Sequence, residues 1–147
     1  MIDRTPTEER PAPIPIVVTH QAGVRFAAQV GAHELILDQP FRGGGRNAGP
    51  SPIDLLGAAL GACVALYVHK FLVTRNVAEE GLQVEVTQHS ARAPHRIERF
   101  DVCIKLPPEV PALYKPMIEA AARVCPAYNT LARGSQVEIL IEQLAVV

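Results

Sequence analysis

The stretch that decides the fold of this chain is Ser51-Pro-Ile-Asp-Leu-Leu-Gly-Ala-Ala-Leu-Gly-Ala-Cys-Val-Ala-Leu-Tyr-Val68. It opens with Ser51 as a helix N-cap and Pro52 at the first helical position, and Asp54 lies near the positive end of the helix dipole. Residues 55–68 contain no charged and no strongly polar side chain, so no face of this helix is suited to water. We expect a helix from Ser51 to about Arg75 that is buried on all sides.

This helix is predicted to be a core helix and not a membrane span. The uncharged run of 14 residues, 55–68, is shorter than the ~20 residues that cross a bilayer, and Asp54 and His69 bracket it closely. Gly57 and Gly61 stand four residues apart, which lets another backbone approach one face of the helix. A chain of 147 residues can hardly wrap such a helix alone, so we expect a homodimer.

Short alternating apolar segments on both sides of the helix predict β-strands. The order strands, helix, strands, helix, strand favours an α+β fold over a doubly wound sheet. We expect one domain over residues 16–147, preceded by a flexible arm over residues 1–15. The expected elements are strands at 16–20, 24–30 and 34–37, a hairpin of 82–88 and 99–106 joined by the polar connection 89–96, a helix at 110–124 ended by Pro126, and a closing strand at 137–144. Pro116 is expected either to kink the second helix or to mark its effective start.

Composition excludes several classes of protein. With 48% hydrophobic and 20% charged residues the chain can bury a core and is not disordered. Fourteen Lys and Arg against fifteen Asp and Glu give a net charge of −1, which disfavours nucleic acid as a partner. The charged, proline-rich first fifteen residues do not resemble a secretion signal, so we expect a cytoplasmic protein whose three cysteines are not a disulfide framework.

The segment of residues 38–50 is rich in glycine and proline, and we expect a flexible loop. Residues 43–48 loosely match a dinucleotide-binding fingerprint, but the preceding strand and the helix start that this fingerprint needs are missing. We therefore expect no nucleotide or other cofactor. The cysteines and histidines also lack the spacing of zinc ligands, so no metal is expected. Arg42 and Arg46 are the flexible cations nearest to the long helix.

The three cysteines differ in their expected surroundings. Cys63 lies about three turns inside the long helix, too far from its start for the dipole to activate it, so a cation from another segment is needed. Cys125 is expected at the C-terminal end of the second helix, where the negative end of the dipole disfavours a thiolate. If the two act together, Cys63 attacks and Cys125 resolves, although an approaching arginine could reverse these roles. Cys103, on a strand, is interpreted as structural.

Two motifs resemble the OsmC/Ohr family of osmotically inducible and organic hydroperoxide resistance proteins. The first is Gly49-Pro-Ser-Pro-Ile-Asp-Leu-Leu-Gly-Ala-Ala-Leu-Gly-Ala-Cys63, and the second is Cys125-Pro-Ala-Tyr-Asn-Thr-Leu131. The similarity covers about residues 23–143. It implies an intertwined α+β homodimer with two long central helices, antiparallel sheets around them and active sites drawn from both chains.

The resemblance also implies a thiol-dependent peroxidase that reduces organic hydroperoxides. Cys63 would form the sulfenic acid, Cys125 would close a disulfide with it, and a dithiol such as a lipoylated protein would supply electrons. The arginine that holds the family's reactive thiolate falls on Arg42, with Arg25 as a competitor. The glutamate that orients this arginine falls on Ile53, so the chain departs from the family pattern here.

Three functions are open at this point. The first is a cytoplasmic peroxidase built on Cys63, Cys125 and Arg42. The second is a dimer that responds to redox state or binds a small molecule, with little turnover because the glutamate is missing. The third is a structural module in which the cysteines are merely buried.

Overall fold

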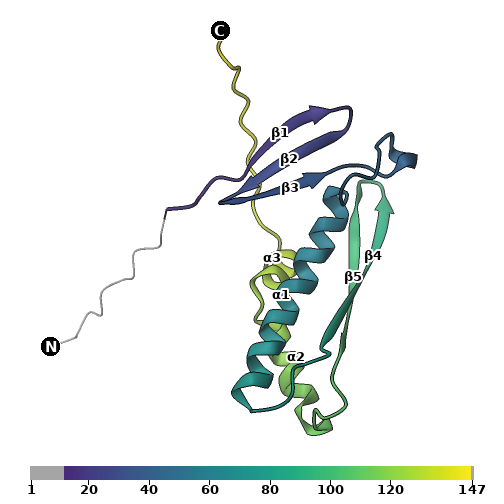
Figure 1. Cartoon of the computed structure of the whole chain (residues 1–147), viewed down its shortest axis with the longest axis vertical. Coiled ribbons are helices and arrows are strands. Elements are labelled where there is room, and N and C mark those ends of the chain that lie inside the picture. Colours follow the sequence, from purple (N-terminus) through teal and green to yellow (C-terminus); the bar gives the residue numbers. More distant parts are fainter. Residues whose placement is uncertain (1–11, 147) are drawn as a thin grey trace, which may run out of the picture. The chain divides into compact units, whose positions relative to one another are not determined.

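The computed structural model describes residues 12–146, which divide into two units between Asp54 and Leu55. The first unit is an antiparallel meander of strands β1 (Val17–Ala22), β2 (Arg25–Val30) and β3 (His33–Leu37), shown in Figure 1. This confirms the three strands expected there. The arm predicted over residues 1–15 lies mostly outside the described residues, and a single domain over residues 16–147 stays a prediction.

The loop after β3 is organised around one buried carboxylate. The side chain of Asp38 is 2% exposed and accepts hydrogen bonds from the backbone amides of Gln39 (2.8 Å), Arg46 (3.0 Å) and Ala48 (3.1 Å). A Cβ atom on Gly45 would lie 1.9 Å from the carbonyl oxygen of Gln39, so the loop closes on itself where only glycine fits. The segment is a loop, as the sequence predicted, and Asp38 ties its two ends together.

Helix α1 (Pro52–Thr74) begins where the sequence predicted. The Ser51 hydroxyl accepts a hydrogen bond from the amide of Asp54 (3.2 Å) and donates one to its carboxylate (2.7 Å). This reciprocal cap satisfies one of the free amides of the first turn and places a negative charge at the positive end of the helix.

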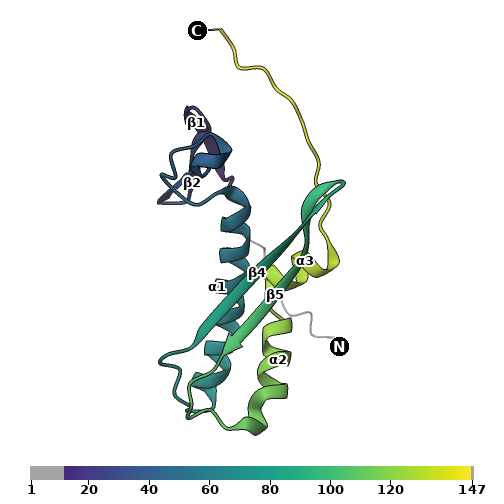
Figure 2. The same cartoon turned by 90° about the vertical axis from the view of Figure 1, so that its right-hand side faces the viewer.

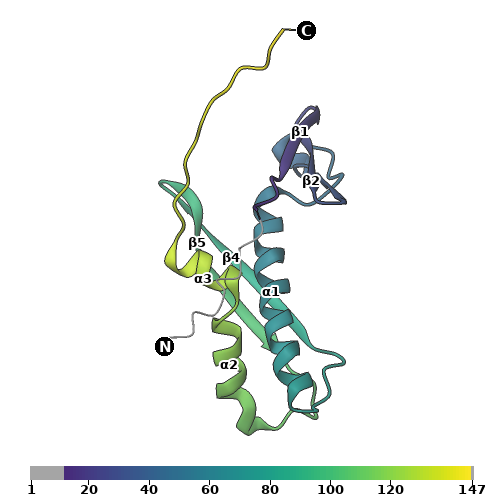
Figure 3. The same cartoon turned by 90° about the vertical axis from the view of Figure 1, so that its left-hand side faces the viewer.

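The second unit packs one side of α1 against the two-stranded sheet of β4 (Gln83–Arg92) and β5 (His95–Lys105) and against α2 (Lys115–Arg123). Helices α1 and α2 run alongside each other, and the hairpin crosses α1 (Figures 2 and 3). The core comprises seven buried residues: Leu60, Val64, Val68, Leu72, Ile118, Ala122 and Cys125.

Two glycines on α1 allow β4 to approach closely. A Cβ atom on Gly61 would lie 3.0 Å from a methyl group of Val86, and one on Gly57 would lie 2.9 Å from the amide carbon of Gln88. The close approach expected at these glycines is therefore an approach of the chain's own sheet.

The opposite side of α1 is partly exposed within residues 12–146. Leu56, Leu66 and Val73 are 39%, 48% and 46% exposed. One hairpin and one helix cover only one side of α1, as expected of a single chain, so burial of α1 on all sides stays a prediction for the dimer. At 23 residues, α1 is also long and apolar enough to cross a membrane by length and composition, which core helices can share.

The remaining elements differ from the sequence predictions in two places. The strands of the hairpin extend to Arg92 and His95, so most of the polar connection expected at 89–96 is itself strand. The second helix begins at Lys115, after a 3₁₀ turn, which confirms Pro116 as the mark of its start. A further helix, α3 (Pro126–Arg133), follows it and was not predicted.

The closing strand predicted at 137–144 is absent from the described chain, in which this segment runs away from α3 unpaired (Figure 1). Its apolar side chains are almost fully exposed, for example Ile139 at 87% and Ile141 at 90%. An alternating apolar segment forms a strand only where a sheet edge and an apolar face receive it, and this segment meets neither.

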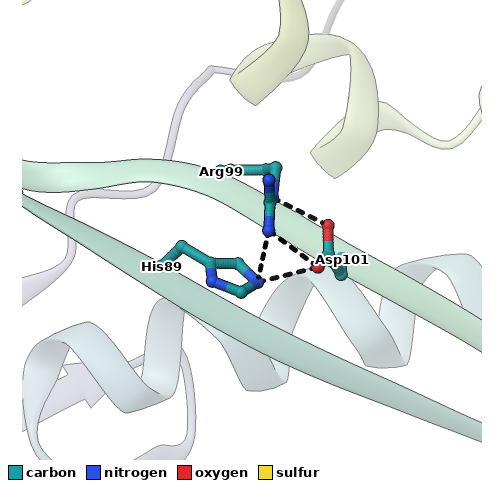
Figure 4. A network of polar contacts seen from close by, with 3 residues as sticks. All are labelled: His89, Arg99 and Asp101. Atoms are coloured by element: carbon teal, nitrogen blue, oxygen red, sulfur yellow. Dashed lines mark hydrogen bonds and ion pairs between the residues drawn. The ribbon is translucent and has the colours of Figure 1, made fainter.

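Polar side chains on the outer face of the hairpin link its two strands (Figure 4). Nε2 of His89 lies 2.7 Å from a carboxylate oxygen of Asp101, and the guanidinium of Arg99 contacts the same carboxylate at 3.1 Å and 3.3 Å. The hydrogen bond with His89 is the main cause that lowers the pKa of Asp101. These groups are partly exposed, so they fix register more than they add stability.

We predict that Asp38→Asn loosens the loop of residues 38–50. The pKa of Asp38 is lowered from its usual 3.8 despite desolvation, chiefly by the hydrogen bond from the Ala48 amide. The amides of Arg46 and Gln39 and the charge of Arg25 act in the same direction. An asparagine cannot accept all these bonds, so hydrogen exchange at the Arg46 and Ala48 amides should accelerate about tenfold.

The pH dependence supplies the control for this prediction. A carboxyl group whose pKa is lowered by folding contributes stability above its unfolded pKa and loses that contribution as the pH falls through the folded value. The excess protection of the wild-type loop over Asp38→Asn should therefore be full at neutral pH, begin to fall at about pH 4 and decrease further as the pH approaches the lowered pKa of Asp38. An equal difference at pH 7 and pH 3 would contradict this account.

Candidate functional site

Cys63 lies near the middle of α1, on the side that faces the core of the second unit. Its side chain is partly exposed and packs against the buried cluster that contains Cys125. An interior helix residue has its backbone amide committed to the helix, so neither terminus of α1 acts on this sulfur. The structure thus places Cys63 where solutes can reach it while its neighbour is enclosed.

Cys125 is fully buried, and the structure packs Cys63 against the core cluster to which Cys125 belongs. The sequence predicted Cys125 at the end of the second helix, but α2 already ends at Arg123. Cys125 is instead the N-cap residue of α3, with Pro126 at the first helical position. The sign of the helix-dipole argument was therefore wrong, because the N-terminus of a helix favours a thiolate.

Burial decides the acidity of Cys125 nevertheless. Desolvation, and then the hydrogen bond with Cys63, raise the pKa of the Cys125 thiol above its usual value of 9.0. The backbone amides of Tyr128 and Ala127, at the start of α3, act in the opposite direction by hydrogen bonding to the sulfur. In the reduced protein Cys125 is thus a protonated, enclosed thiol.

The turn between α2 and α3 is held by Asn129. Its side-chain amide donates to the carbonyl oxygens of Arg123 and Cys125, both at 3.2 Å. Arg123 also donates to the hydroxyl of Tyr128 (2.7 Å) and to Glu119 (2.8 Å). The position of Cys125 is therefore set by side chains from both helices.

Cys103 lies apart from this pair. It is exposed on β5, opposite Glu85 of β4, on the outer face of the hairpin. Glu85 pairs there with Lys105 and raises the pKa of that lysine. Within residues 12–146 no three His, Cys, Asp or Glu side chains gather as a metal-binding group.

The candidate arginines belong to the first unit, whereas both cysteines of the pair belong to the second. Arg42 lies in the exposed 3₁₀ turn Phe41–Gly43, and Arg46 donates its backbone amide to Asp38. Arg25, at the start of β2, has a buried Nε atom without a hydrogen-bond partner in the described part of the chain, and its charge acts on Asp38. Arg25 is thus the arginine associated with Asp38, while Arg42 is free of contacts in the structure's described hydrogen bonds and ion pairs.

Ile53 occupies the first turn of α1 and is 48% exposed. The neighbouring Asp54 is engaged by the Ser51 hydroxyl in the helix cap, as described above. Its carboxylate therefore serves the helix start and is not a substitute for a glutamate at position 53.

The contribution of α3 was missed at the level of sequence. Its signal was available, because proline is favoured at the first position of a helix and Cys125 directly precedes Pro126. Reading Pro126 as the end of one helix, and not as the beginning of the next, placed Cys125 at the wrong helix terminus. The amides of Ala127 and Tyr128, which carry no sequence signature, follow from this placement.

Several solved structures resemble this chain. An osmotic stress induced and detoxification response protein of Psychrobacter arcticus is 23% identical, with a TM-score of 0.74 over 83% of this chain and 90% of that one. An OsmC-like protein of Mycoplasma pneumoniae is 18% identical, with a TM-score of 0.69 over 80% and 86%. An organic hydroperoxide resistance protein OsmC of Legionella pneumophila is 19% identical, with a TM-score of 0.53 over 82% and 91%. At these identities the likeness concerns the fold.

No curated protein matches the sequence significantly. The family model of OsmC-like proteins, in contrast, matches residues 43–140, a range that includes α1, the hairpin and the α2–α3 turn. This match spans more than half of the chain and contains both Cys63 and Cys125. The chain therefore belongs to the OsmC-like protein family.

Proposed function

We propose that this protein is a cytoplasmic, thiol-dependent peroxidase that reduces organic hydroperoxides, with Cys63 as the peroxidatic and Cys125 as the resolving cysteine. The observation that carries the proposal is the packing of a partly exposed thiol, Cys63, against the core cluster that contains a fully buried one, Cys125. Family membership supports it, as do neighbours named organic hydroperoxide resistance proteins, from Legionella pneumophila and Elizabethkingia anophelis.

The reaction has two steps on this pair. The Cys63 thiolate attacks one oxygen of the peroxide bond and the alcohol leaves with a proton, so that the sulfur becomes a sulfenic acid. Cys125 then attacks this sulfur, water leaves, and a disulfide joins the two residues. A dithiol, such as a lipoyl group on a protein, returns both thiols to the reduced state. Apolar residues of the core beside Cys63, such as Tyr67 and Val64, suit the organic part of the substrate.

Arg42 is proposed as the cation that stabilises the Cys63 thiolate. Neither terminus of α1 can do this, since Cys63 lies in the interior of the helix. Arg42 is exposed on its turn and not engaged with Asp38, whereas Arg25 acts on that carboxylate. No metal or other cofactor is required by this chemistry.

We predict that Cys63→Ser abolishes the consumption of cumene hydroperoxide, because a serine hydroxyl is not ionised at neutral pH and cannot carry the sulfenic acid. Cys125→Ser should still consume one equivalent of peroxide, leaving a sulfenic acid on Cys63 that dimedone traps, and then stop. Cys103→Ser is the matched control and should retain full turnover. Unchanged peroxide consumption by Cys63→Ser would remove the basis of the proposal.

A second function is favoured by one observation, the isoleucine at position 53. Without a carboxylate to orient it, an arginine near Cys63 is less well placed, and the protein would then be a redox-responsive or small-molecule-binding dimer with little turnover. We predict that Ile53→Glu raises the rate at which Cys63 reacts with peroxide by about threefold or more, the range of an exposed ion pair.

The matched control for this substitution is Ile53→Gln, which has the size of glutamate without its charge and should leave the rate unchanged. Stopped-flow measurement of the reaction with cumene hydroperoxide distinguishes the cases. A fast wild-type reaction that Ile53→Glu does not improve would show that the chain activates Cys63 by other means.

We further propose that the protein is an intertwined homodimer, as the family resemblance implies. The uncovered side of α1 and the tail of residues 137–144 expose apolar side chains that a single described chain leaves in water. Exposed apolar surface of this extent is typical of an interaction site. The tail of one copy would become a strand when it pairs with a sheet edge in the assembled dimer.

We predict a mass of about 32 kDa in solution, twice the 15.9 kDa of one chain. The double substitution Ile139→Lys/Ile141→Lys should shift the protein towards monomer or lower its thermal stability, because both side chains would be buried in the dimer. Glu138→Lys/Glu142→Lys, which alternates with those positions, is the matched control. Sedimentation equilibrium provides the measurement, and a monomeric wild type at micromolar concentration would contradict the proposal.

A further inference from the structure

The two sulfur atoms of the proposed redox pair differ in access. Cys63 is partly exposed, whereas the side chain of Cys125 is 0% exposed and belongs to the innermost core together with Val68 and Leu72. A thiolate that reduces a disulfide must reach one of its two sulfur atoms, and the other sulfur departs. Access therefore favours Cys63 as the sulfur that is attacked.

The start of α3 is arranged to receive the departing sulfur. Cys125 is its N-cap residue, with φ −59° and ψ 130°, so it stands at the positive end of that helix. The amides of Ala127 and Tyr128 act to lower the pKa of its thiol. Pro126, between them and Cys125, contributes no amide hydrogen. A negative charge on Cys125 is stabilised by the free amides of the first turn of α3. A sulfur whose thiolate is stabilised is the better leaving group.

These donors are held in place before any reaction. Asn129 bonds the carbonyl oxygens of Arg123 and Cys125, which fixes the angle between α2 and α3. The ring of Tyr128 is held by the guanidinium of Arg123, which donates to its hydroxyl and lies 5.7 Å from the ring centre. These contacts hold the start of α3, with Cys125 as its N-cap, in a fixed position relative to α2.

We propose that the Cys63–Cys125 disulfide is reduced with a fixed polarity, in which the reductant attacks the accessible Sγ of Cys63 and the buried Cys125 leaves as a thiolate at the N-terminus of α3. This inference rests on the proposed function, since it requires that the two cysteines form a disulfide. It assigns to the N-terminus of α3 a role in regeneration that differs from any role in the attack on peroxide.

The reaction balances with a dithiol as the reductant. Its first thiolate forms a bond to the sulfur of Cys63, the Cys63–Cys125 bond breaks, and the electron pair leaves on Cys125, which later takes up a proton. The second thiol of the dithiol then attacks the mixed disulfide at its own first sulfur. This closes the ring of the oxidised dithiol and releases Cys63 as a thiolate. Two electrons have then passed to the protein, one proton of the dithiol is on Cys125 and the other is in solvent.

The polarity can be read by stopping the reaction after its first step. In a Cys103→Ser background, the disulfide is formed with diamide, so that its formation does not depend on peroxide. A limiting amount of 2-mercaptoethanol, which has a single thiol, is added, the reaction is quenched with acid, and free thiols are alkylated. Peptide mass spectrometry then identifies which cysteine carries the mixed disulfide.

We expect mercaptoethanol on Cys63 and the alkyl group on Cys125, in at least about tenfold excess over the reverse product at low conversion. Mercaptoethanol on Cys125 in half or more of the product would overturn the inference while leaving the peroxidase proposal intact. Failure of diamide to form any Cys63–Cys125 disulfide would instead overturn the proposed redox pair, and the inference with it.

Single-cysteine variants provide an independent measurement. The remaining thiol in Cys125→Ser and in Cys63→Ser is converted to the mixed disulfide with 2-mercaptoethanol in denaturant, and the protein is refolded. Dithiothreitol should release the adduct from Cys63 at least about tenfold faster than from Cys125, because the sulfur of Cys63 is accessible and that of Cys125 is buried. Equal release rates from two folded variants, judged by circular dichroism, would contradict the inference.

Discussion

The packing of α1 against the β4–β5 hairpin and α2 is the constraint on which the rest of the site depends. The close approach of β4 at Gly57 and Gly61 allows the core to close over Val64 and Val68, and this core also encloses Cys125. Cys63 lies on the same helix at the margin of that core. One packing interaction thus fixes one sulfur inside and the other within reach of solvent, and the chemical difference between two identical side chains follows from it.

The prediction of α1 from sequence succeeded because its determinants are local. Ser51, Pro52 and Asp54 act within one helical turn, and the cap bonds observed there are those the residue types favour. The meander was predicted for the same reason, since Gly23 and Gly31 adopt φ +58° and +57° at its turns. The contact of Cys63 with Cys125 was reached through the family resemblance, because no local pattern encodes it.

The failures concern features that depend on more distant partners. The tail of residues 137–144 has the alternation of a strand, but pairing requires an edge that this chain does not offer it. The uncovered side of α1 reflects the same incompleteness. Asp38 also escaped sequence reasoning, because its three amide donors become neighbours only once the glycine-rich loop has folded around it.

The Cys-Pro step at 125–126 shows how one misplaced boundary changes a chemical argument. With Cys125 at the end of α2, the dipole alone would have opposed its thiolate at every stage. As the N-cap of α3 it is opposed in the reduced protein by burial and by the thiol of Cys63, while the amides of Ala127 and Tyr128 favour the anion. The contact with a Cys63 thiol is lost once Cys63 carries another sulfur, whereas the amides remain. The same surroundings can therefore keep Cys125 protonated in the reduced protein and stabilise its thiolate when the disulfide is cleaved. Activation of Cys63, for which position 53 lacks a carboxylate, and regeneration of the pair thus depend on different parts of the fold.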